Sequence, residues 1–394
     1  MAIQAVILCG GLGTRLRPIT NKIPKPLAPL NGKPFIDYLL KQLKSQRIKN
    51  VLLLTGYLGS LIKKKIGHGK KYGLKITYLD GPVDWDTGRR LWESKKLLDK
   101  EFLLLYSDNF SSLNLNNLKK FHKKKNLSVT LTVSKKTPGN ISVTKNELVK
   151  NFAIRRSKKN NFVEIGYMII KKKNLFAEFK NKNCNLSELL RSLSKKKQAS
   201  AFEAIDDYYS ISDKIRLKLT EKYLSKKKII LIDRDGVINY KAKKARYINF
   251  WSEFKFIPRV YKSLKKLSKN GFKFIVISNQ AGISRGETKL KELIKIHKNM
   301  IKKFKSDGID ILKVYFCPHN WNTGCFCRKP MPGMLFEASK DFNFRLDNTL
   351  FIGDDPRDLM AAKKANCKGI LWRNNNKYPE IDDLVKKTLK SGVS

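Results

Sequence analysis

The stretch that most constrains the fold of this chain is residues 228–239, which read KIILIDRDGVIN. A run of branched apolar residues ends on Asp233, and Asp235 and Gly236 follow closely. Such a run is typical of a buried parallel strand, and open α/β folds bind ligands where the carboxyl ends of their strands meet. Two carboxylates at that edge can share a divalent cation and divide the work of attacking phosphorus and moving a proton. An aspartate-rich turn that merely follows a strand is the alternative interpretation.

Length and composition indicate two folded domains. The chain has 394 residues, more than one ordinary core accommodates, and its hydrophobic content of 41% is typical of globular proteins. A helical pattern ends near residue 224, and residues 225–228 form a short boundary without a long flexible linker. We therefore predict one domain over residues 1–224 and a second over residues 225–394.

The formal net charge of +50 at pH 7 bears on the choice of partners. Such a charge is typical of proteins that bind nucleic acid or membrane surfaces. The lysines, however, lie in short runs over both halves, without the aromatic signature of RNA-binding domains. No stretch approaches the roughly 18 apolar residues of a membrane span, and the first apolar run is too short for a signal peptide. We expect a solvated lysine-rich surface, no specific nucleic acid or membrane partner, and a cytoplasmic location.

A second constraint is the glycine-rich turn near the amino terminus. Residues 5–9 (AVILC) predict a buried strand, and the sequence GGLGTR follows from Gly10. Glycines let backbone N–H groups approach a phosphate chain closely, and arginine adds donors that match phosphate oxygens. Further strand patterns at 51–55 and 74–79, with a helical pattern before them, predict a doubly wound α/β sheet of the Rossmann type.

This pattern resembles the sugar-phosphate nucleotidyltransferases, most closely the guanylyltransferases that act on mannose 1-phosphate and heptose 1-phosphate. The segments that carry the resemblance are GGLGTRLRPIT and PKPLAPLNGKPFIDYLL. It implies that a sugar 1-phosphate attacks the α-phosphorus of a nucleoside triphosphate, with GTP as the expected nucleotide. It implies that the triphosphate is held by Gly10, Gly11, Gly13, Arg15 and Lys25. It further implies that Asp108, after a strand at 102–105, holds Mg²⁺.

Three segments depart from this family's pattern. Arg89 and Arg90 stand where small residues are expected near the base, and Ser210 stands where a second metal-ligating aspartate is expected. Asp206 or Asp207 could supply that carboxylate instead. The candidates to replace the family's lysine on the sugar phosphate are Arg155 and Lys158. The first domain is therefore expected to be either an active nucleotidyltransferase or a nucleotide-binding and assembly module.

Polar residues recur at strand ends along the second half. A strand pattern at 274–277 leads into Ser278, whose hydroxyl suits a phosphate oxygen. A strand pattern at 349–352 leads to Asp354, which can complete a hard-oxygen site for Mg²⁺. Between them in sequence, Lys329 offers the cation that a transferring phosphoryl group needs.

A cluster of thiols indicates a metal, because cysteines in the cytoplasm stay reduced. Three cysteines and one histidine within eleven residues form the ligand set of a Cys₃His zinc site. The expected ligands are Cys317, His319, Cys325 and Cys327. Four protein ligands leave no place for an activated water, so the role would be structural, fixing the loop before Lys329. A redox pair or isolated free thiols are the alternatives.

The remaining cysteines and histidines are expected to be structural or solvated. Cys9, Cys184 and Cys367 lie singly and are expected to be packing residues. His297 lies on the apolar stripe of a predicted helix and is also expected to pack. The other two histidines considered, His68 and His122, lie among lysines and are expected to be solvated.

The order of the motifs DRDGVIN, SNQAGISRG, CPH with CxCRKPxPGM, and GDD resembles the haloacid dehalogenase superfamily of phosphatases. Within it, the bacterial D-glycero-D-manno-heptose 1,7-bisphosphate 7-phosphatases are the most similar branch, and the histidinol phosphatases are a sister branch. The resemblance implies that Asp233 forms an aspartyl-phosphate, that Asp235 handles the proton, and that Ser278 and Lys329 steady the phosphoryl group. It implies that Mg²⁺ binds Asp233, the backbone carbonyl of Asp235, and Asp354.

The resemblance also implies a substrate pocket and a function. Arg328 would recognise the second phosphate, and Asn279, Gln280 and the loop at 240–247, with Tyr247, would line the pocket. The fusion favours heptose over histidinol phosphate, since a nucleotidyltransferase has no place in histidine synthesis. We predict a bifunctional enzyme of nucleotide-heptose synthesis with Mg²⁺ and structural Zn²⁺, and small-molecule partners. A phosphatase with an inactive first domain, or a nucleic-acid-associated basic protein, are the alternatives.

Overall fold

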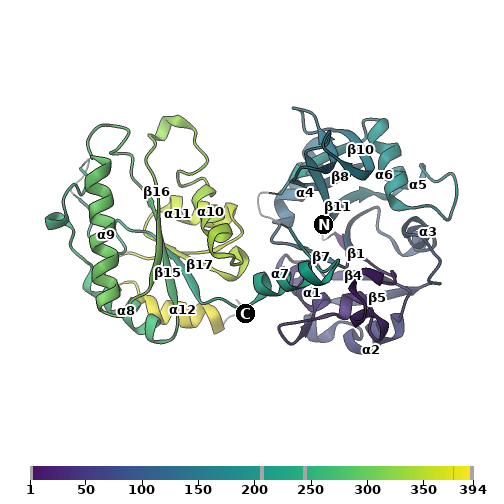
Figure 1. Ribbon diagram of the computed structural model, residues 1–394, viewed down its shortest axis with the longest axis horizontal. Coiled ribbons are helices and arrows are strands. Elements are labelled where there is room, and N and C mark those ends of the chain that lie inside the picture. The colour runs from purple at the N-terminus through teal and green to yellow at the C-terminus, as the bar shows by residue number, and fades with distance from the viewer. Residues whose placement is uncertain (1–2, 205–207, 243–245, 376, 391–394) are drawn as a thin grey trace. The chain divides into compact units, whose positions relative to one another are not determined.

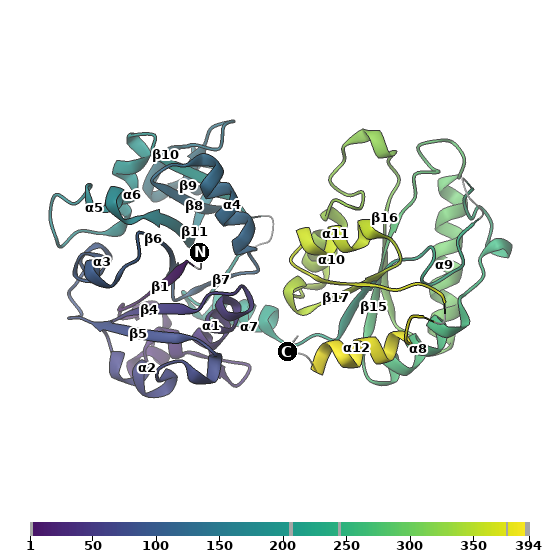
Figure 2. The ribbon, with the colours of Figure 1, turned by 180° about the vertical axis from the view of Figure 1, so that it is seen from behind.

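The computed structural model describes residues 3–204, 208–242, 246–375 and 377–390. The chain divides into two compact units, Met1–Leu224 and Ser225–Ser394. Each unit is an α/β domain in which helices pack on a central sheet (Figures 1 and 2). The α/β class predicted for both halves is confirmed. Within the described ranges, no helix is long and apolar enough to span a membrane.

In the described residues, the first unit is built on a mixed sheet of nine strands. The strands are β1 (Gln4–Cys9), β4 (Asn50–Thr55), β5 (Lys75–Asp80), β6 (Glu101–Tyr106), β8 (Val129–Lys135), β9 (Gly139–Val143), β10 (Val149–Ser157), β11 (Phe162–Lys171) and β12 (Ala199–Glu203). Strands β6, β1, β4 and β5 are parallel neighbours in that order, and β11 joins β6 antiparallel. Ala5 and Ile7 of β1 pack into one core and Val6 and Leu8 into the other. Burial on both faces explains why these strands have continuous apolar sequences.

Helices cover both faces of this sheet. They are α1 (Phe35–Ser45), α2 (Gly59–Ile66), α3 (Thr87–Glu93), α4 (Leu115–Lys125), α5 (Lys172–Phe176), α6 (Leu186–Lys195) and α7 (Lys214–Leu224). Two short ladders complete the unit: β2 (Pro29–Leu30) with β3 (Lys33–Pro34), and β7 (Asn109–Ser111) with β13 (Tyr208–Ser210). The expectation that His122 on α4 is solvated is wrong. Its side chain is buried and its Nδ1 lies 2.7 Å from the Thr130 hydroxyl, because the neighbouring lysines occupy only the outer face of α4.

The second unit is built on a parallel sheet of five strands in the order β16-β15-β14-β17-β18. The strands are β14 (Ile229–Ile232), β15 (Lys273–Asn279), β16 (Ile311–Cys317), β17 (Leu350–Gly353) and β18 (Lys368–Leu371). The central strand β14 pairs with both β15 and β17. The residues that end these three strands therefore meet at one edge of the sheet.

Two layers of helices cover this sheet. The helices are α8 (Pro258–Lys269), α9 (Leu290–Ser306), α10 (Gly333–Phe342), α11 (Pro356–Lys364) and α12 (Ile381–Lys390). Helices α8, α9 and α12 share a core with Ile230 and Ile232, whereas α10 and α11 share a core with Ile229 and Leu231. The three cysteines expected to pack, Cys9, Cys184 and Cys367, are all buried, and His68 is exposed as expected.

Candidate active sites

The carboxyl edge of the second sheet gathers groups from motifs that lie far apart in the sequence. Asp233 follows β14, Ser278 lies near the end of β15, and Asp354 follows β17. Together with Asp235 and Lys329 they line a cavity of about 110 Å³. The structure thus brings together all the residues for which a catalytic or Mg²⁺-binding role was predicted in this half.

Asp233 is buried and held in one orientation. The Nζ of Lys329 lies 2.7 Å from its Oδ1, and the backbone N–H of Arg234 donates to the same oxygen at 2.8 Å. Burial is the largest influence on this carboxyl and raises its pKa to about 7, although the charge of Lys329 acts in the opposite direction.

Lys329 is 3% exposed and is held by three acceptors. Its Nζ lies 2.7 Å from Asp233 Oδ1 and 2.7 Å from Asp358 Oδ1, and it donates to the carbonyl of Ile277 at 2.9 Å. Burial alone would lower the pKa of Lys329, but the two carboxylates raise it, so the ammonium is charged. Asp358 was not predicted. It lies in the first turn of α11, shortly after β17 and Asp354. The sequence run GDDPRD, which contains a further aspartate close to Asp354, is the signal that could have indicated it.

Asp235 is fixed by a hydrogen-bonded shell. Its oxygens accept from Arg234 at 2.9 Å, Asn239 at 3.0 Å and Gln280 at 2.8 Å. Burial would raise the pKa of Asp235, but the Arg234 charge and these hydrogen bonds outweigh it, so the pKa lies below its usual value. Arg234 in turn lies 2.8 Å from His297 Nε2. Burial lowers the pKa of His297 to about 3, so its neutral ring accepts this hydrogen bond. His297 packs as expected, and its orienting contact with Arg234 was not predicted.

The carboxylates at this edge fit a divalent cation. Oxygens of Asp233, Asp354 and Asp358 lie within 4.8 Å of one another. Among the described residues, no donor reaches the buried Oδ1 of Asp354, and its Oδ2 lies 2.6 Å from Lys241 Nζ. A buried carboxylate oxygen without a donor is the kind of ligand that Mg²⁺ prefers. Gly236, at a φ of +95°, leaves room for this carboxylate, because a Cβ there would lie 2.2 Å from Asp354 Oδ2.

The four residues predicted to bind substrate differ in whether they line this cavity. Asn279 lines the cavity, and its amide exchanges two 3.0 Å hydrogen bonds with the backbone of Lys329. Gln280 turns toward Asp235 and donates to the Ser278 hydroxyl at 2.7 Å. Arg328 donates to the carbonyl of His319, and Tyr247 lies against the Gly282 turn. Of these four, only Asn279 is part of the cavity lining, and residues 243–245 of the predicted loop lie outside the described residues.

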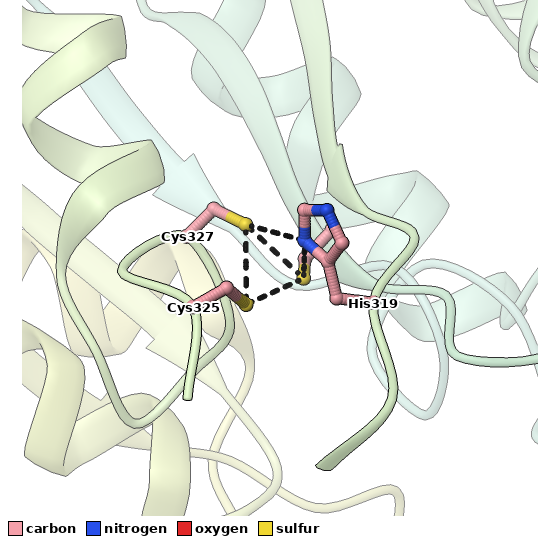
Figure 3. A group of neighbouring side chains, drawn as sticks. His319, Cys325 and Cys327 are labelled. Atoms are coloured by element: carbon pink, nitrogen blue, oxygen red, sulfur yellow. Dashed lines mark hydrogen bonds between the residues drawn. The ribbon is translucent and has the colours of Figure 1, made fainter. Parts of the chain in front are cut away.

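The predicted zinc ligands converge from two sides of one loop, and Figure 3 shows His319, Cys325 and Cys327 directed toward one another. The Sγ atoms of the three cysteines lie 3.3–3.6 Å apart, and His319 Nδ1 lies 3.2 Å from Cys327 Sγ and 3.5 Å from Cys317 Sγ. A disulfide would need about 2.05 Å, which excludes paired sulfurs. Ligands of a tetrahedral zinc with bonds of roughly 2.0–2.3 Å lie roughly 3.3–3.8 Å apart, close to the separations of these four atoms, so the cluster fits Zn²⁺.

The first unit has a separate cavity of about 670 Å³ at the carboxyl ends of its parallel strands. Its lining includes every residue predicted to bind nucleotide or metal in this half: Gly10, Gly11, Gly13, Arg15, Lys25 and Asp108. Lys25 and Asp108, both part of this lining, form an ion pair. Gly13 has a φ of +65°, a conformation that suits glycine in the turn after β1.

The predicted substitution beside Asp108 is visible in the structure. Ser210 pairs with Asn109 across the β7–β13 ladder, and the N–H of Ile211 donates to the carbonyl of Asp108 at 2.9 Å. A hydroxyl therefore stands next to Asp108 where the family's second carboxylate was expected. Asp206 and Asp207, the suggested substitutes, lie outside the described residues.

Further charged groups line the same cavity. Arg156 contributes to the lining, whereas Arg155 and Lys158, the two candidates for a sugar-phosphate contact, do not. Arg155 and Arg156 are neighbours on β10 and point to opposite faces of the strand, whereas Lys158 lies just beyond the end of β10. Arg216 on α7 and Glu164 on β11 also line it. Burial raises the pKa of Glu164 to about 7, although a hydrogen bond from the backbone N–H of Gly166 acts in the opposite direction.

Two family models match the chain. The model described as nucleotidyl transferase matches residues 4–212, and the model described as polynucleotide kinase 3 phosphatase matches residues 228–369. The chain is 34% identical over 208 residues to the D-glycero-alpha-D-manno-heptose 1-phosphate guanylyltransferase of Campylobacter jejuni, covering 52% of this chain and 93% of the relative.

Curated heptose bisphosphate phosphatases are similar to the second half. The D-glycero-alpha-D-manno-heptose-1,7-bisphosphate 7-phosphatase of Campylobacter jejuni is 34% identical over 152 residues, which cover 39% of this chain and 86% of the relative. The D-glycero-beta-D-manno-heptose-1,7-bisphosphate 7-phosphatase of Pseudomonas putida is 33% identical over 161 residues, which cover 41% of this chain and 91% of the relative. The chain therefore belongs to the nucleotidyl transferase family in its first half and to the family of heptose bisphosphate phosphatases in its second, as the two resemblances predicted.

Proposed function

We propose that this chain removes the 7-phosphate of D-glycero-D-manno-heptose 1,7-bisphosphate and then transfers a guanylyl group from GTP to the remaining 1-phosphate. The observation that carries the proposal is the convergence of both predicted sets of groups, each in its own cavity. The product of the first reaction is the substrate of the second, which gives a chemical reason for joining the two domains.

In the phosphatase reaction, Asp233 attacks phosphorus, and the bond between phosphorus and the sugar's C7 oxygen breaks. Asp235 protonates that leaving oxygen and then takes a proton from the water that hydrolyses the aspartyl-phosphate. Although the pKa of Asp235 lies below its usual value in the free protein, an arriving phosphate would favour its protonated form through charge repulsion. Lys329 keeps the attacking carboxylate aimed, and Ser278 would donate to a phosphoryl oxygen. Mg²⁺ held by Asp233 and Asp354 would neutralise charge on the transferred group.

In the nucleotidyltransferase reaction, a 1-phosphate oxygen attacks the α-phosphorus of GTP and pyrophosphate leaves. The N–H groups of the glycine-rich turn, with Arg15 and Lys25, would hold the triphosphate, and Arg156 and Arg216 would meet the sugar phosphate. Asp108 would supply one carboxylate to Mg²⁺, and Ser210 would offer only a hydroxyl at the position where a second carboxylate is expected. This departure favours a second candidate, a first unit that binds nucleotide without releasing pyrophosphate.

The Cys₃His cluster would hold a structural Zn²⁺. Its four protein ligands fill a tetrahedral coordination shell, and Cys327 precedes Lys329 by two residues. Zinc would therefore fix the loop that delivers Lys329 to Asp233.

The deciding experiment measures phosphate and pyrophosphate release by the full chain from both anomers of heptose 1,7-bisphosphate, with each nucleoside triphosphate in turn. We expect phosphate release without nucleotide, and pyrophosphate release with GTP. Phosphate without pyrophosphate, together with measurable GTP binding, would support the second candidate. Histidinol phosphate and a 3′-phosphorylated oligonucleotide serve as controls, the latter because of the second family model and the net charge of +50. Faster turnover of either control would refute the heptose assignment.

A further inference from the structure

Arg90, one of the two arginines that depart from the nucleotidyltransferase pattern, is 4% exposed and is part of the lining of the nucleotide cavity. Its Nη1 donates to the carbonyl of Thr55 at 2.5 Å and its Nη2 to the carbonyl of Pro82 at 2.6 Å. Weaker hydrogen bonds of 3.4 Å reach the carbonyls of Gly81 and Gly10. These carbonyls end or follow β4, β5 and β1, so one side chain ties together the carboxyl ends of three parallel strands.

Two glycines make room for this guanidinium. A Cβ at Gly10 would lie 2.2 Å from Arg90 Cζ, and a Cβ at Gly56 would lie 2.6 Å from Arg90 Nη2. Any larger residue at either position would displace the arginine from the strand ends. Gly10 therefore has a second role besides opening the backbone to phosphate, because it also allows the Arg90 guanidinium to contact the backbone of the turn.

The charge of Arg90 is held in a poorly solvated place. In the described part of the chain its hydrogen bonds go to neutral carbonyls, and Asp80 and Asp84 attract it through space. The Asp80 carboxylate itself accepts from the Thr55 hydroxyl at 2.9 Å. A charge among carbonyl dipoles, away from bulk water, acts more strongly on a nearby anion than a surface charge does.

We propose that Arg90 is a positioning residue for the triphosphate of the nucleotide. It holds the glycine-rich turn against the ends of β4 and β5, and its charge polarises the Gly10–Gly11 peptide through the Gly10 carbonyl. The N–H of Gly11 thereby becomes a stronger donor to a phosphate oxygen. This inference rests on the proposed nucleotidyltransferase function, because it assigns Arg90 to the same cavity.

The test compares how the full-length chain and its variants bind GTP and GMP by calorimetry. Arg90→Met removes the charge and the hydrogen bonds, Arg90→Gln removes the charge but keeps amide donors, and Arg90→Lys keeps the charge. Arg191→Met on α6 is the control, since Arg191 is an exposed arginine of the same unit that is not part of the cavity lining. Phosphate release by the second unit checks that each preparation is active.

We expect Arg90→Met and Arg90→Gln to weaken GTP about tenfold or more and GMP about threefold or less, because the charge acts on the phosphates. Arg90→Lys should recover part of the GTP affinity, and Arg191→Met should bind both nucleotides as the parent does. Equal losses for GTP and GMP, or no loss, would overturn the role of Arg90 while leaving the proposed function intact. Failure of the parent chain to bind GTP would overturn both.

Discussion

The substitution Asp233→Asn should abolish phosphatase activity and at the same time stabilise the second unit at neutral pH. Burial raises the pKa of Asp233 to about 7, against 3.8 for an exposed aspartate. At 1.36 kcal/mol for each pKa unit, the ionised carboxylate lowers stability by at most about 4 kcal/mol. Because the folded pKa is the higher one, this stability is present below pH 4 and is lost as the pH rises through about 7. Asparagine stays neutral, so the variant avoids the loss.

The assay is a urea unfolding series in which unfolding is monitored by hydrogen exchange of peptides from β14 and β15. It is carried out at pH 5 and pH 8, without added Mg²⁺ and without a chelator. We expect the variant to exceed the parent by about 1–4 kcal/mol at pH 8 and by less at pH 5. Phosphate release should fall by about four orders of magnitude or more, as the loss of a nucleophile does. Retained activity would refute the role of Asp233. If the difference in unfolding free energy between variant and parent were the same at pH 5 and pH 8, burial would not raise the pKa of Asp233.

Three further predictions concern the other groups. Lys329→Met leaves two buried carboxylates without their cation and should destabilise the second unit by about 3–5 kcal/mol, measured by the same urea series. Equal stability of parent and variant would contradict the buried network. Cys327→Ser should release zinc, measured by elemental analysis, and lower phosphate release while GTP binding is unchanged; full zinc retention would argue against the four-ligand site. Ser210→Asp adds a carboxylate beside Asp108 and should lower the Mg²⁺ concentration that half-saturates pyrophosphate release, an effect that a distant Ser210 would not produce.

Strand positions and the groups at their ends could be predicted because each depends on local pattern. The apolar run before Asp233 and the glycine after Asp235 indicate a strand that stops at a sheet edge, and parallel pairing then brings Ser278 and Asp354 to the same edge. Thiol spacing likewise indicated the Cys₃His cluster, because ligand identity and separation are both visible in sequence.

The missed contacts depend on which way a side chain turns after the backbone is placed. Asp358 reaches Lys329 only because α11 begins directly behind the Asp354 strand. Arg156 rather than Arg155 lines the nucleotide cavity because successive side chains of β10 point to opposite faces of the sheet. A change of one residue in the strand's register would exchange the two faces, so the sequence does not show which arginine reaches the cavity. The buried orientation of the Arg90 side chain depends on carbonyls at the ends of three strands, and no local sequence pattern shows that these carbonyls meet.

In the proposed phosphatase reaction, the phosphoryl group is transferred first to the carboxylate of Asp233. The most direct measurement is an acid quench of the chain during turnover of heptose 1,7-bisphosphate, followed by borohydride reduction and mass spectrometry of the peptide that contains residue 233. Borohydride reduces an acyl phosphate but leaves a free carboxylate intact, so we expect reduction at Asp233 in the parent and no reduction in Asp233→Asn. Reduction at another residue, or rapid phosphate release with no reduced peptide, would contradict this proposal.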